Sequence, residues 1–258
     1  MKKDYIRLVI SDLHIGSHNS KEEQILELLQ TVEFDELILA GDIIDFIKVP
    51  TFTKMTAKIF SYLSKLDKKI TYIIGNHDIS FASFTGKRLL NIEFTNHCEF
   101  VYGEKKYRIV HGHEFDSGLV HWPVFMNFVS IIQDWLERTF AWKLASWWVD
   151  RRLKKRKLRR IWDILKWNKD ADVFIMGHTH VPEVVIWVDE NQKIKTYVNC
   201  GDWESHMTYV IIKDNELRLK KFKPSQPKPL GREEQQSESP SESNSKPRQG
   251  ILDKPSHR

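Results

Sequence analysis

The chain has 258 residues, and its 40 Lys and Arg against 35 Asp and Glu give a formal net charge of +5. A hydrophobic content of 41% suffices for a substantial core, which excludes wholesale disorder, a collagen-like chain and a disulfide scaffold. The charge is concentrated, because residues 151–160 carry eight cations; without them 32 cations face 35 anions, a net charge of −3. Seven of the nine tryptophans flank or follow the same region: Trp122, Trp135, Trp142, Trp147, Trp148, Trp162 and Trp167. This region therefore differs in role from the mildly acidic remainder.

The first 115 residues alternate between short apolar runs and longer segments with helical spacing. We predict buried strands at residues 5–10, 36–40 and 70–74, and helices at residues 21–31 and 53–66. This β-α-β-α-β order predicts a mainly parallel sheet covered by helices.

From residue 173 onward the sequence predicts closely spaced strands joined as antiparallel hairpins. The predicted strands are 173–176, 183–188, 194–198, 208–212 and 217–222. Asn191 and the pair Asp214 and Asn215 are the predicted turn residues.

Three further features of the sequence limit the classes to which the protein can belong. Residues 224–258 are rich in Pro, Ser, Gln and charge, and we predict a disordered tail there. No apolar stretch reaches the roughly 18 residues of a membrane span, and the short apolar run near the N-terminus does not predict a signal peptide. Cys98 and Cys200 fit a reducing compartment and lack zinc-finger spacing.

Five short motifs place carboxylate, imidazole and amide groups at or just beyond predicted strand ends. They are Asp12-Leu13-His14, Gly41-Asp42, Gly75-Asn76-His77-Asp78, His111-Gly112-His113 and Gly177-His178-Thr179-His180. Each motif alone is weak, since an Asp-x-His pair is common as a helix cap and Gly-Asp is a common turn. Together they deliver these groups to one edge of a sheet, where open α/β folds bind their ligands.

The composition of this set suits two divalent metal ions. Imidazole suits Zn, Fe and Mn, carboxylate and amide oxygens suit harder ions, and one carboxylate can bridge two cations. Two cations about 3.5 to 4 Å apart can hold a phosphoryl group for in-line attack. Because no thiolate is among the candidates, a purely structural zinc site is disfavoured.

The order of these motifs over residues 12–180 resembles the calcineurin-like metallophosphoesterase superfamily. The resemblance implies a mixed α/β (α+β) fold, a four-layer αββα sandwich of two mixed β-sheets flanked by helices, with a helical lid insertion. Residues 1–118 and 169–223 would form the metallophosphoesterase domain, and residues 119–168 the lid. The implied cofactors are two divalent ions, with Mn²⁺ as the first choice and Zn²⁺, Fe²⁺ or another ion as alternatives.

The same resemblance implies roles for individual residues. Asp12, His14 and His180 would bind the first metal, Asn76, His111 and His178 the second, and Asp42 would bridge the two. His77 would donate a hydrogen bond or a proton to the phosphate or the leaving oxygen, which makes His77, Asp42 and Asn76 the implied catalytic residues.

A closer similarity, over roughly residues 5–222, is to the UDP-2,3-diacylglucosamine diphosphatases of lipid A synthesis and their relatives. It rests on the first motif with Ile15 and Gly16, on residues 41–45 and 111–116, and on residues 199–205. The chain departs from that branch at His77, where an arginine is usual, and in the length and composition of the insertion.

Residues 119–168 have the spacing of two amphipathic helices, at the position where relatives place a lid over the metals. Core packing would also explain this spacing. The cationic segment 151–160 leads into an apolar face at Leu158, Ile161, Trp162 and Leu165, a pattern typical of a surface-lying membrane anchor attracted by about 1 kcal/mol per cation. Nucleic acid and a plain solvated helix face are the alternatives. We favour an anionic membrane, because the aromatics follow helical spacing and stacking platforms for single strands usually sit on open strands.

Contacts to substrate or within the lid are expected from His113, Asp116, Trp135, Trp147, Trp148, Arg151 and Arg152. The resemblance implies a metal-dependent phosphoester or diphosphate hydrolase in the cytoplasm, held peripherally at the membrane face. The implied reaction splits UDP-2,3-diacylglucosamine, or a similar lipid-linked phosphate, into UMP and 2,3-diacylglucosamine 1-phosphate. One alternative is a phosphodiesterase or nuclease acting on nucleic acid or a cyclic nucleotide. Another is a non-catalytic scaffold, which the complete ligand set disfavours.

Overall fold

The structure is a computed structural model that describes residues 5–47, 50–115 and 170–225. The chain divides into two units, Met1–Pro224 and Ser225–Arg258, and the fold described below belongs to the first. The predicted lid, residues 119–168, and the predicted tail beyond residue 225 lie outside the described residues. Among the residues that are described, no helix combines the length and apolarity needed to span a bilayer.

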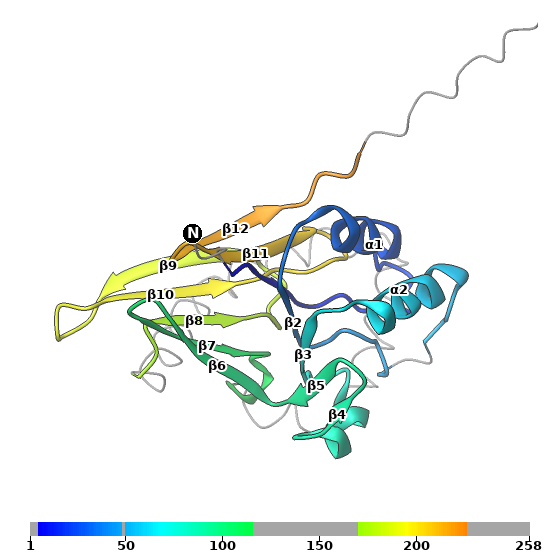
Figure 1. Ribbon diagram of the computed structural model, residues 1–258, viewed down its shortest axis with the longest axis horizontal. Coiled ribbons are helices and arrows are strands. Elements are labelled where there is room, and N and C mark those ends of the chain that lie inside the picture. The colour runs from blue at the N-terminus through cyan, green and yellow to red at the C-terminus, as the bar shows by residue number, and fades with distance from the viewer. Residues whose placement is uncertain (1–4, 48–49, 116–169, 226–258) are drawn as a thin grey trace, which may run out of the picture. The chain divides into compact units, whose positions relative to one another are not determined.

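A seven-stranded mixed sheet forms the first layer of strands, in the order β12-β11-β1-β2-β3-β5-β4 (Figure 1). Its central strands run parallel: β1 (Arg7–Ile10), β2 (Glu36–Ala40), β3 (Lys69–Ile73) and β5 (Ile92–Thr95). Antiparallel strands complete its edges: β4 (Arg88–Leu89), β11 (Thr208–Lys213) and β12 (Glu216–Lys221). The predicted parallel β-α-β-α-β core is confirmed.

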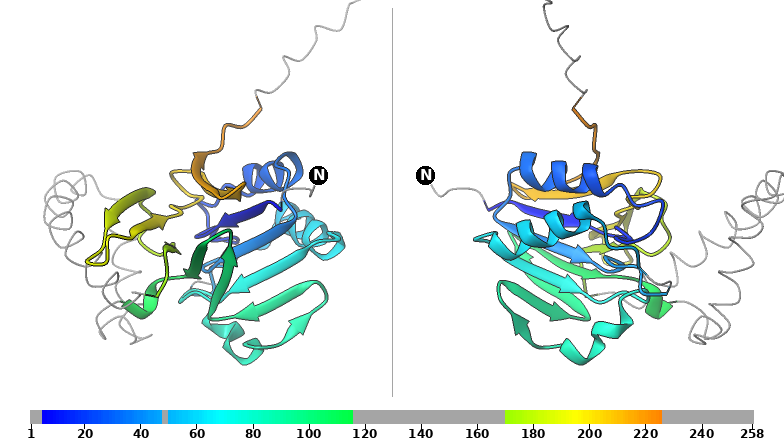
Figure 2. Two further views of the ribbon diagram at one scale, coloured as in Figure 1. Left: turned by 60° about the vertical axis from the view of Figure 1, so that its left-hand side comes forward. Right: turned by 90° about the vertical axis from the view of Figure 1, so that its right-hand side faces the viewer.

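Two helices cover one face of this sheet (Figure 2). In α1 (Glu22–Thr31) the buried residues Ile25, Leu28 and Leu29 recur at the spacing of one helix face. In α2 (Lys54–Lys65) the same holds for Ile59 and Leu63, and the Thr53 hydroxyl caps the first turn by accepting the backbone N–H groups of residues 55 and 56. Each helix is therefore stabilised by packing one apolar face against the sheet.

A five-stranded mixed sheet forms the second layer of strands, in the order β6-β7-β8-β10-β9. Its strands are β6 (His97–Tyr102), β7 (Lys105–Val110), β8 (Val173–Met176), β9 (Glu183–Val188) and β10 (Ile194–Asn199). Strand β8 lies between β7 and β10 and is parallel to both. The short helices η1 (Ile79–Phe84) and η2 (His113–Phe115) follow β3 and β7.

The prediction of hairpins throughout the second half is wrong in two places, because β8 does not pair with β9 and because β10 and β11 belong to different sheets. Strands β9 and β10 pair antiparallel, as do β11 and β12, and Asp214 and Asn215 at the latter turn have φ of 53° and 61°. Positive φ at both central residues is the backbone that a two-residue hairpin needs, and Asn and Asp tolerate it. Strand β8, however, pairs parallel with β10 because β9 intervenes in the chain and occupies the sheet edge.

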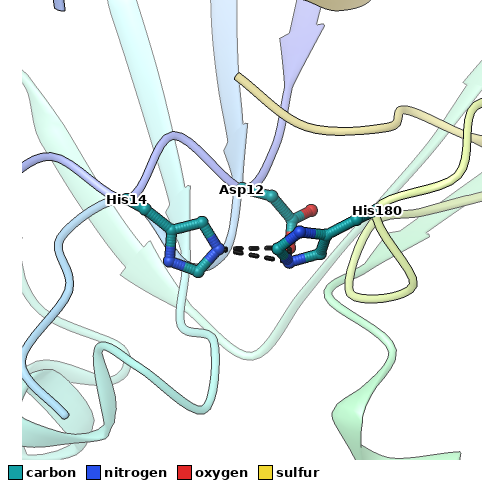
Figure 3. Close-up of side chains that lie close together, drawn as sticks. All are labelled: Asp12, His14 and His180. Carbon is teal, nitrogen blue, oxygen red and sulfur yellow. Dashed lines mark hydrogen bonds and ion pairs between the residues drawn. The ribbon is translucent and has the colours of Figure 1, made fainter. Parts of the chain in front are cut away.

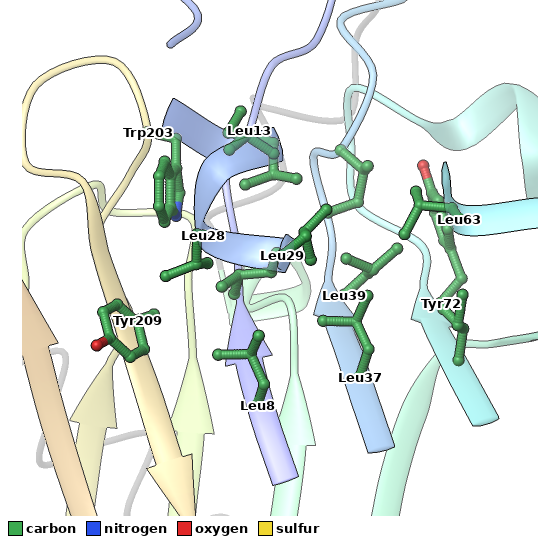
Figure 4. Packing of buried hydrophobic residues seen from close by; sticks show 14 of the residues in the cluster. Leu8, Leu13, Leu28, Leu29, Leu37, Leu39, Leu63, Tyr72, Trp203 and Tyr209 are labelled. Atoms are coloured by element: carbon green, nitrogen blue, oxygen red, sulfur yellow. The ribbon is translucent and has the colours of Figure 1, made fainter. Parts of the chain in front are cut away.

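Buried side chains of the described residues form three clusters, because alternate residues of a strand point to opposite faces of its sheet; the smallest cluster includes Phe174 and Tyr197 of the second sheet. Leu8, Leu37 and Leu39 face the helices and belong to a cluster that includes Leu28 and Trp203 (Figure 4). The intervening residues of β1 and β2 face the second sheet and pack against buried side chains of β7, β8 and β10. The structure therefore confirms a mixed α/β fold with two stacked mixed sheets, and in its described part the α-helices cover the first of them.

Candidate metal centre

The predicted ligands lie in loops that directly follow strands of both sheets. Asp12, Asp42 and Asn76 come after β1, β2 and β3, which are neighbours in the first sheet. His111 and His178 come after β7 and β8, which are neighbours in the second. Because neighbouring parallel strands end at the same edge, both sheets present their loops to one common region.

Asp12, His14 and His180 form a first group of donors that could hold a metal ion. Nε2 of His180 lies 3.2 Å from Oδ1 of Asp12 and 3.2 Å from Nε2 of His14, and Nε2 of His14 lies 4.0 Å from the same Asp12 oxygen. Figure 3 shows the three side chains converging from two loops, one that carries Asp12 and His14 and one that carries His180. Asp12 and His14 are buried, whereas 36% of the His180 side chain is exposed, so the group is open to solvent on the His180 side.

Asp42, His111 and His178 form a second such group. Nε2 of His111 lies 3.1 Å from Oδ2 of Asp42 and 3.0 Å from Oδ1 of Asn76, which adds an amide oxygen to the group. Nδ1 of His111 lies 3.0 Å from the backbone oxygen of Ala40. Since a carbonyl can only accept, Nδ1 carries the proton, and the neutral ring has its Nε2 lone pair available for a metal.

His77 lies beside both groups and makes a contact that the sequence did not predict. Its Nδ1 lies 2.9 Å from Oδ1 of Asp45, and its Nε2 lies 3.8 Å from Oδ2 of Asp42. His14, Asp45 and His77 are also close enough together to form a third possible metal group. The same geometry fits the role that the resemblance implies, with Nδ1 bonded to Asp45 and a proton held at Nε2.

The electrostatics of the centre couple buried carboxylates to imidazoles. Burial would raise the pKa of Asp42, but the charge of His111 and a hydrogen bond with it hold the pKa well below the usual range. Burial would lower the pKa of His111, yet Asp42 raises it to about 10. Burial would likewise lower the pKa of His180, but the hydrogen bond with Asp12 and the charge of Asp12 raise it to about 9. For His14 burial dominates and lowers the pKa.

Asp78, the last residue of its motif, braces the loop that carries Asp42. Its carboxylate oxygens accept the backbone N–H groups of Ile43, Ile44 and Gly75 at 3.2, 3.0 and 3.3 Å. Burial, followed by the charge of Asp42, raises the pKa of Asp78 to about 7. Because backbone N–H groups already bond both carboxylate oxygens, Asp78 stabilises the loops of the centre and is not a candidate metal ligand.

Backbone strain is concentrated at the predicted ligands. Asp12, His14, Asp42, His178 and His180 have φ of 54°, 46°, 55°, 64° and 59°, the left-handed region that non-glycine residues rarely adopt. Such a conformation costs about 1–3 kcal/mol per residue and persists only where the surroundings hold it. The loops are therefore held in shape by the fold around them.

Glycines in the motifs are required by close approach of the carboxylates. A Cβ on Gly177 would lie 1.8 Å from Oγ of Ser11 and 2.2 Å from Oδ2 of Asp12. A Cβ on Gly75 would lie 2.1 Å from Oδ1 of Asp42. The space that a Cβ would need at these two positions is therefore already occupied by the side chains of Ser11, Asp12 and Asp42.

The donor set fits divalent cations. Asp12 and Asp42 are 0% and 1% exposed, and their ion-pair partners among the described residues are histidine rings rather than Lys or Arg. Buried carboxylates that lack a permanent cation are costly unless a cation joins them. Imidazole nitrogens, carboxylates and one amide oxygen match the preferences of Mn²⁺, Zn²⁺ or Fe²⁺.

A cavity of about 580 Å³ adjoins the second group. His113 is among its lining residues, together with Arg108, Asn96, His97 and apolar side chains from β7, η1 and the residue that follows β3, Ile74. The ring of His113 lies 5.5 Å from that of His111, and its buried Nδ1 has no hydrogen-bond partner among the residues that the structure describes. His113 is thus beside the centre, as expected of a substrate contact. Six other predicted contacts lie outside the described residues: Asp116, Trp135, Trp147, Trp148, Arg151 and Arg152.

The structure also brings residues to the centre that the sequence analysis left without a role. Asp45 and Asp78 both stood within quoted motifs; Asp45 bonds His77, 32 residues away, and Asp78 bonds Ile44, 34 residues away. Asn199 contacts the loop of His178 and His180 from a neighbouring strand. The signals for Asn199 were its place at the end of an apolar strand and within residues 199–205, which carry part of the family resemblance.

Residues 7–182, more than half of the chain, match the calcineurin-like phosphoesterase family. A UDP-2,3-diacylglucosamine hydrolase of Psychromonas ingrahamii is 24% identical over 236 residues, which cover 82% of this chain and 95% of that protein. The hydrolase of the same name from Vibrio cholerae is 25% identical over 234 residues, 79% of this chain and 93% of that protein. The YfcE phosphoesterase from E. coli superposes with a TM-score of 0.44 at 15% identity, over 82% of this chain and 90% of that one.

The chain therefore belongs to the calcineurin-like phosphoesterase family. It is a metal-dependent phosphoester hydrolase.

Proposed function

We propose that this protein hydrolyses the diphosphate of UDP-2,3-diacylglucosamine or a similar lipid-linked nucleotide, releasing UMP and 2,3-diacylglucosamine 1-phosphate. Two relatives that bear the name of this hydrolase match about four-fifths of the chain. The match extends beyond the metal motifs, since it covers more than 90% of each relative. This breadth supports a shared substrate class more strongly than the motifs alone would.

The observation that carries the proposal is that Asp42, a member of the second donor group, lies beside His77, whose ring is 4.6 Å from that of His14 in the first group. The Asp42 carboxylate lies 3.1 Å from Nε2 of His111 in the second group and 3.8 Å from Nε2 of His77. The charge of Asp42 also acts on His14 in the first group. Two adjoining donor groups with a buried carboxylate on the side where they meet fit two cations that share one phosphoryl group.

In this proposal Asp12, His14 and His180 would hold one cation, Asn76, His111 and His178 would hold the other, and Asp42 would be a ligand of both. When bound, two divalent cations lower the pKa of a water molecule and neutralise the charge that develops on the phosphoryl group.

His77 supplies the proton in this scheme. Burial would lower its pKa, but the hydrogen bond to Asp45 and the charge of Asp42 raise it, so the ring holds a proton at Nε2 more readily than an ordinary histidine. A proton held there can pass to the leaving phosphate oxygen, and the Asp45 carboxylate keeps the ring oriented while it does so.

The proposal places the protein at the cytoplasmic face of an anionic membrane. Its support is the sequence of residues 151–165, in which eight cations lead into an apolar face. Flotation with vesicles that contain anionic lipid should carry the protein upward, and binding should weaken as salt rises. Binding to single-stranded oligonucleotides without vesicle binding would instead favour the nuclease alternative.

The test of the activity is hydrolysis of UDP-2,3-diacylglucosamine by metal-stripped protein reloaded with Mn²⁺, followed by ³¹P NMR. We expect UMP and 2,3-diacylglucosamine 1-phosphate with wild type and nearly no turnover with Asp42→Asn. Asp172→Asn is the matched control, because Asp172 lies at the opposite end of β8 and bonds Lys106 and Lys195. Cleavage of an oligonucleotide or a cyclic nucleotide, with UDP-2,3-diacylglucosamine left intact, would refute the proposal that the substrate is a lipid-linked nucleotide.

A further inference from the structure

The turn that carries His178 and His180 is strained and short. The N–H of Thr179 donates to the carbonyl of Gly177 at 2.8 Å, which closes a three-residue turn with His178 at its centre. His178 has φ of 64° and His180 has φ of 59°. A three-residue turn with positive φ at its central residue is rare and strained, so its shape depends on support from outside the turn.

Asn199 provides that support from the end of β10, the neighbour of β8. Its side chain is fully buried, and its amide Nδ2 donates to the carbonyl of Gly177 at 2.6 Å and to Oγ1 of Thr179 at 3.0 Å. The same amide therefore binds both ends of the turn that presents His178. Its Oδ1 accepts the N–H of Gly201 at 2.9 Å.

The orientation of this amide follows from its partners. The carbonyl of Gly177 can only accept and the N–H of Gly201 can only donate, so Nδ2 must face the turn and Oδ1 must face Gly201. Asn199 has both of its hydrogens bound to the turn, and a rotated amide would place an oxygen against the Gly177 carbonyl. No other rotamer of the amide group satisfies these two partners together.

The segment that follows Asn199 is tied to the other side of the centre. The N–H of Cys200 donates to the carbonyl of Met176, and the N–H of Trp203 donates to the carbonyl of Asp12 at 3.0 Å. The Trp203 side chain is completely buried in the main core cluster. Residues 199–203 thus join the turn of His178 and His180 to the loop of Asp12 through backbone contacts anchored in the core.

We propose that Asn199 is a positioning residue that sets the placement of His178 and His180, and through them the affinity of both metal groups. The proposal rests on the proposed function, because it takes these histidines as metal ligands. Groups behind metal ligands that hold them in place typically change metal affinity by about 10- to 100-fold when removed. Asn199 acts through the backbone of the turn, so the lower end of this range, about tenfold, is the expected effect.

A purely structural role is the competing explanation, and the chain offers a matched control for it. Asn91 also donates its amide to two backbone acceptors, the carbonyls of Leu63 and Leu66 at 3.0 and 2.7 Å. These acceptors lie at the end of α2, outside the metal groups. Asn91→Ala therefore removes the same kind of amide contact without touching the proposed centre.

The experiment titrates metal-stripped full-length protein with Co²⁺ and records both affinity and the visible absorption spectrum, whose bands report the ligand geometry. Alanine is preferred to aspartate at position 199, because an added carboxylate would itself attract a cation. We expect Asn199→Ala to bind Co²⁺ about tenfold more weakly than wild type and to change the spectrum. Asn91→Ala should lower the thermal midpoint while leaving affinity and spectrum unchanged.

Substitutions at Thr179 give a second and milder comparison. Thr179→Val keeps the volume but removes the hydroxyl that accepts from Asn199, whereas Thr179→Ser retains it. We expect weaker Co²⁺ binding by the valine variant and recovery by the serine variant, a comparison that decides the matter even if Asn199→Ala does not fold.

Each result has a distinct meaning. If wild type binds no Co²⁺, the proposed function fails. If wild type binds Co²⁺, and Asn199→Ala or Thr179→Val loses thermal stability without any change in affinity or spectrum, the positioning role of Asn199 is refuted.

Discussion

Substituting Gly177 by alanine perturbs the proposed centre by a single methyl group. The backbone of Gly177 is outside the left-handed region, so alanine adds no conformational strain there. The added Cβ would, however, lie 1.8 Å from Oγ of Ser11 and 2.2 Å from Oδ2 of Asp12, whereas ordinary contacts begin at about 3.4 Å. The turn or the two side chains must therefore separate by about 1.6 Å, the difference between 3.4 and 1.8 Å.

A displacement of this size has two separable consequences. Overpacking of a buried site costs about 1–3 kcal/mol of unfolding free energy. A misplacement of about 1 Å in a catalytic group can lower turnover about 10²-fold. Because Asp12 belongs to the first donor group, Gly177→Ala should lose at least that much activity.

Gly86→Ala is the control for stability. Gly86 has φ of 76°, so alanine is strained there, but no atom lies within 4 Å of the added Cβ. This strain costs about 1–2 kcal/mol, so the two variants should unfold at similar urea concentrations. Turnover of a chromogenic phosphodiester should fall about 10²-fold in Gly177→Ala and stay near wild type in Gly86→Ala. Near-normal turnover in Gly177→Ala, despite reduced stability, would refute the placement of Asp12 in the centre.

Three further predictions concern the proton donor, the metals and the core. His77→Arg, which keeps a cation beside Asp45, should retain more turnover than His77→Ala; equal loss in both would contradict a donor role for this position. Without metal the pKa values of His111 and His180 are about 10 and about 9, so at neutral pH both rings are protonated and must lose a proton to bind a cation. Metal affinity should therefore rise with pH and binding should release protons, and calorimetry in buffers of different ionisation enthalpy that detects no release would contradict this. Leu28→Ala should lower the unfolding free energy by about 2–5 kcal/mol in a urea titration, because Leu28 is 0% exposed in the core. The same change at Leu89, which is 53% exposed, should cost far less, and equal costs would contradict the core described above.

The sequence predicts the described fold well where strands are continuously apolar. Strands β2 and β8 lie at the predicted residues, because buried apolar runs bounded by polar turns leave little choice. Strand β9 lies at the predicted residues because its sequence is largely apolar, although its side chains alternate between half-buried and exposed. Strands β6 and β7 were not predicted. β6 alternates between exposed and half-buried residues, so its apolar signal is diluted. A mixture of polar and apolar residues at a sheet edge carries less periodic information than a central strand.

The centre was predictable to the extent that its donors follow strand ends. Asp12, Asp42 and His111 each come shortly after a buried strand, and parallel neighbours bring such positions together. The bracing contacts were not predictable, because they depend on pairings between distant segments. The contact between His77 and Asp45 spans 32 residues, and that between Asn199 and Gly177 requires the parallel pairing of β8 with β10.

Anomalous diffraction from crystals soaked in Mn²⁺ tests the central claim most directly. The account predicts two metal peaks, both within coordination distance of the Asp42 carboxylate. One should lie against Asp12, His14 and His180, and the other against the remaining predicted ligands, Asn76, His111 and His178. A single peak bound by His14, Asp45 and His77, with Asp42 bound to no metal, would contradict it.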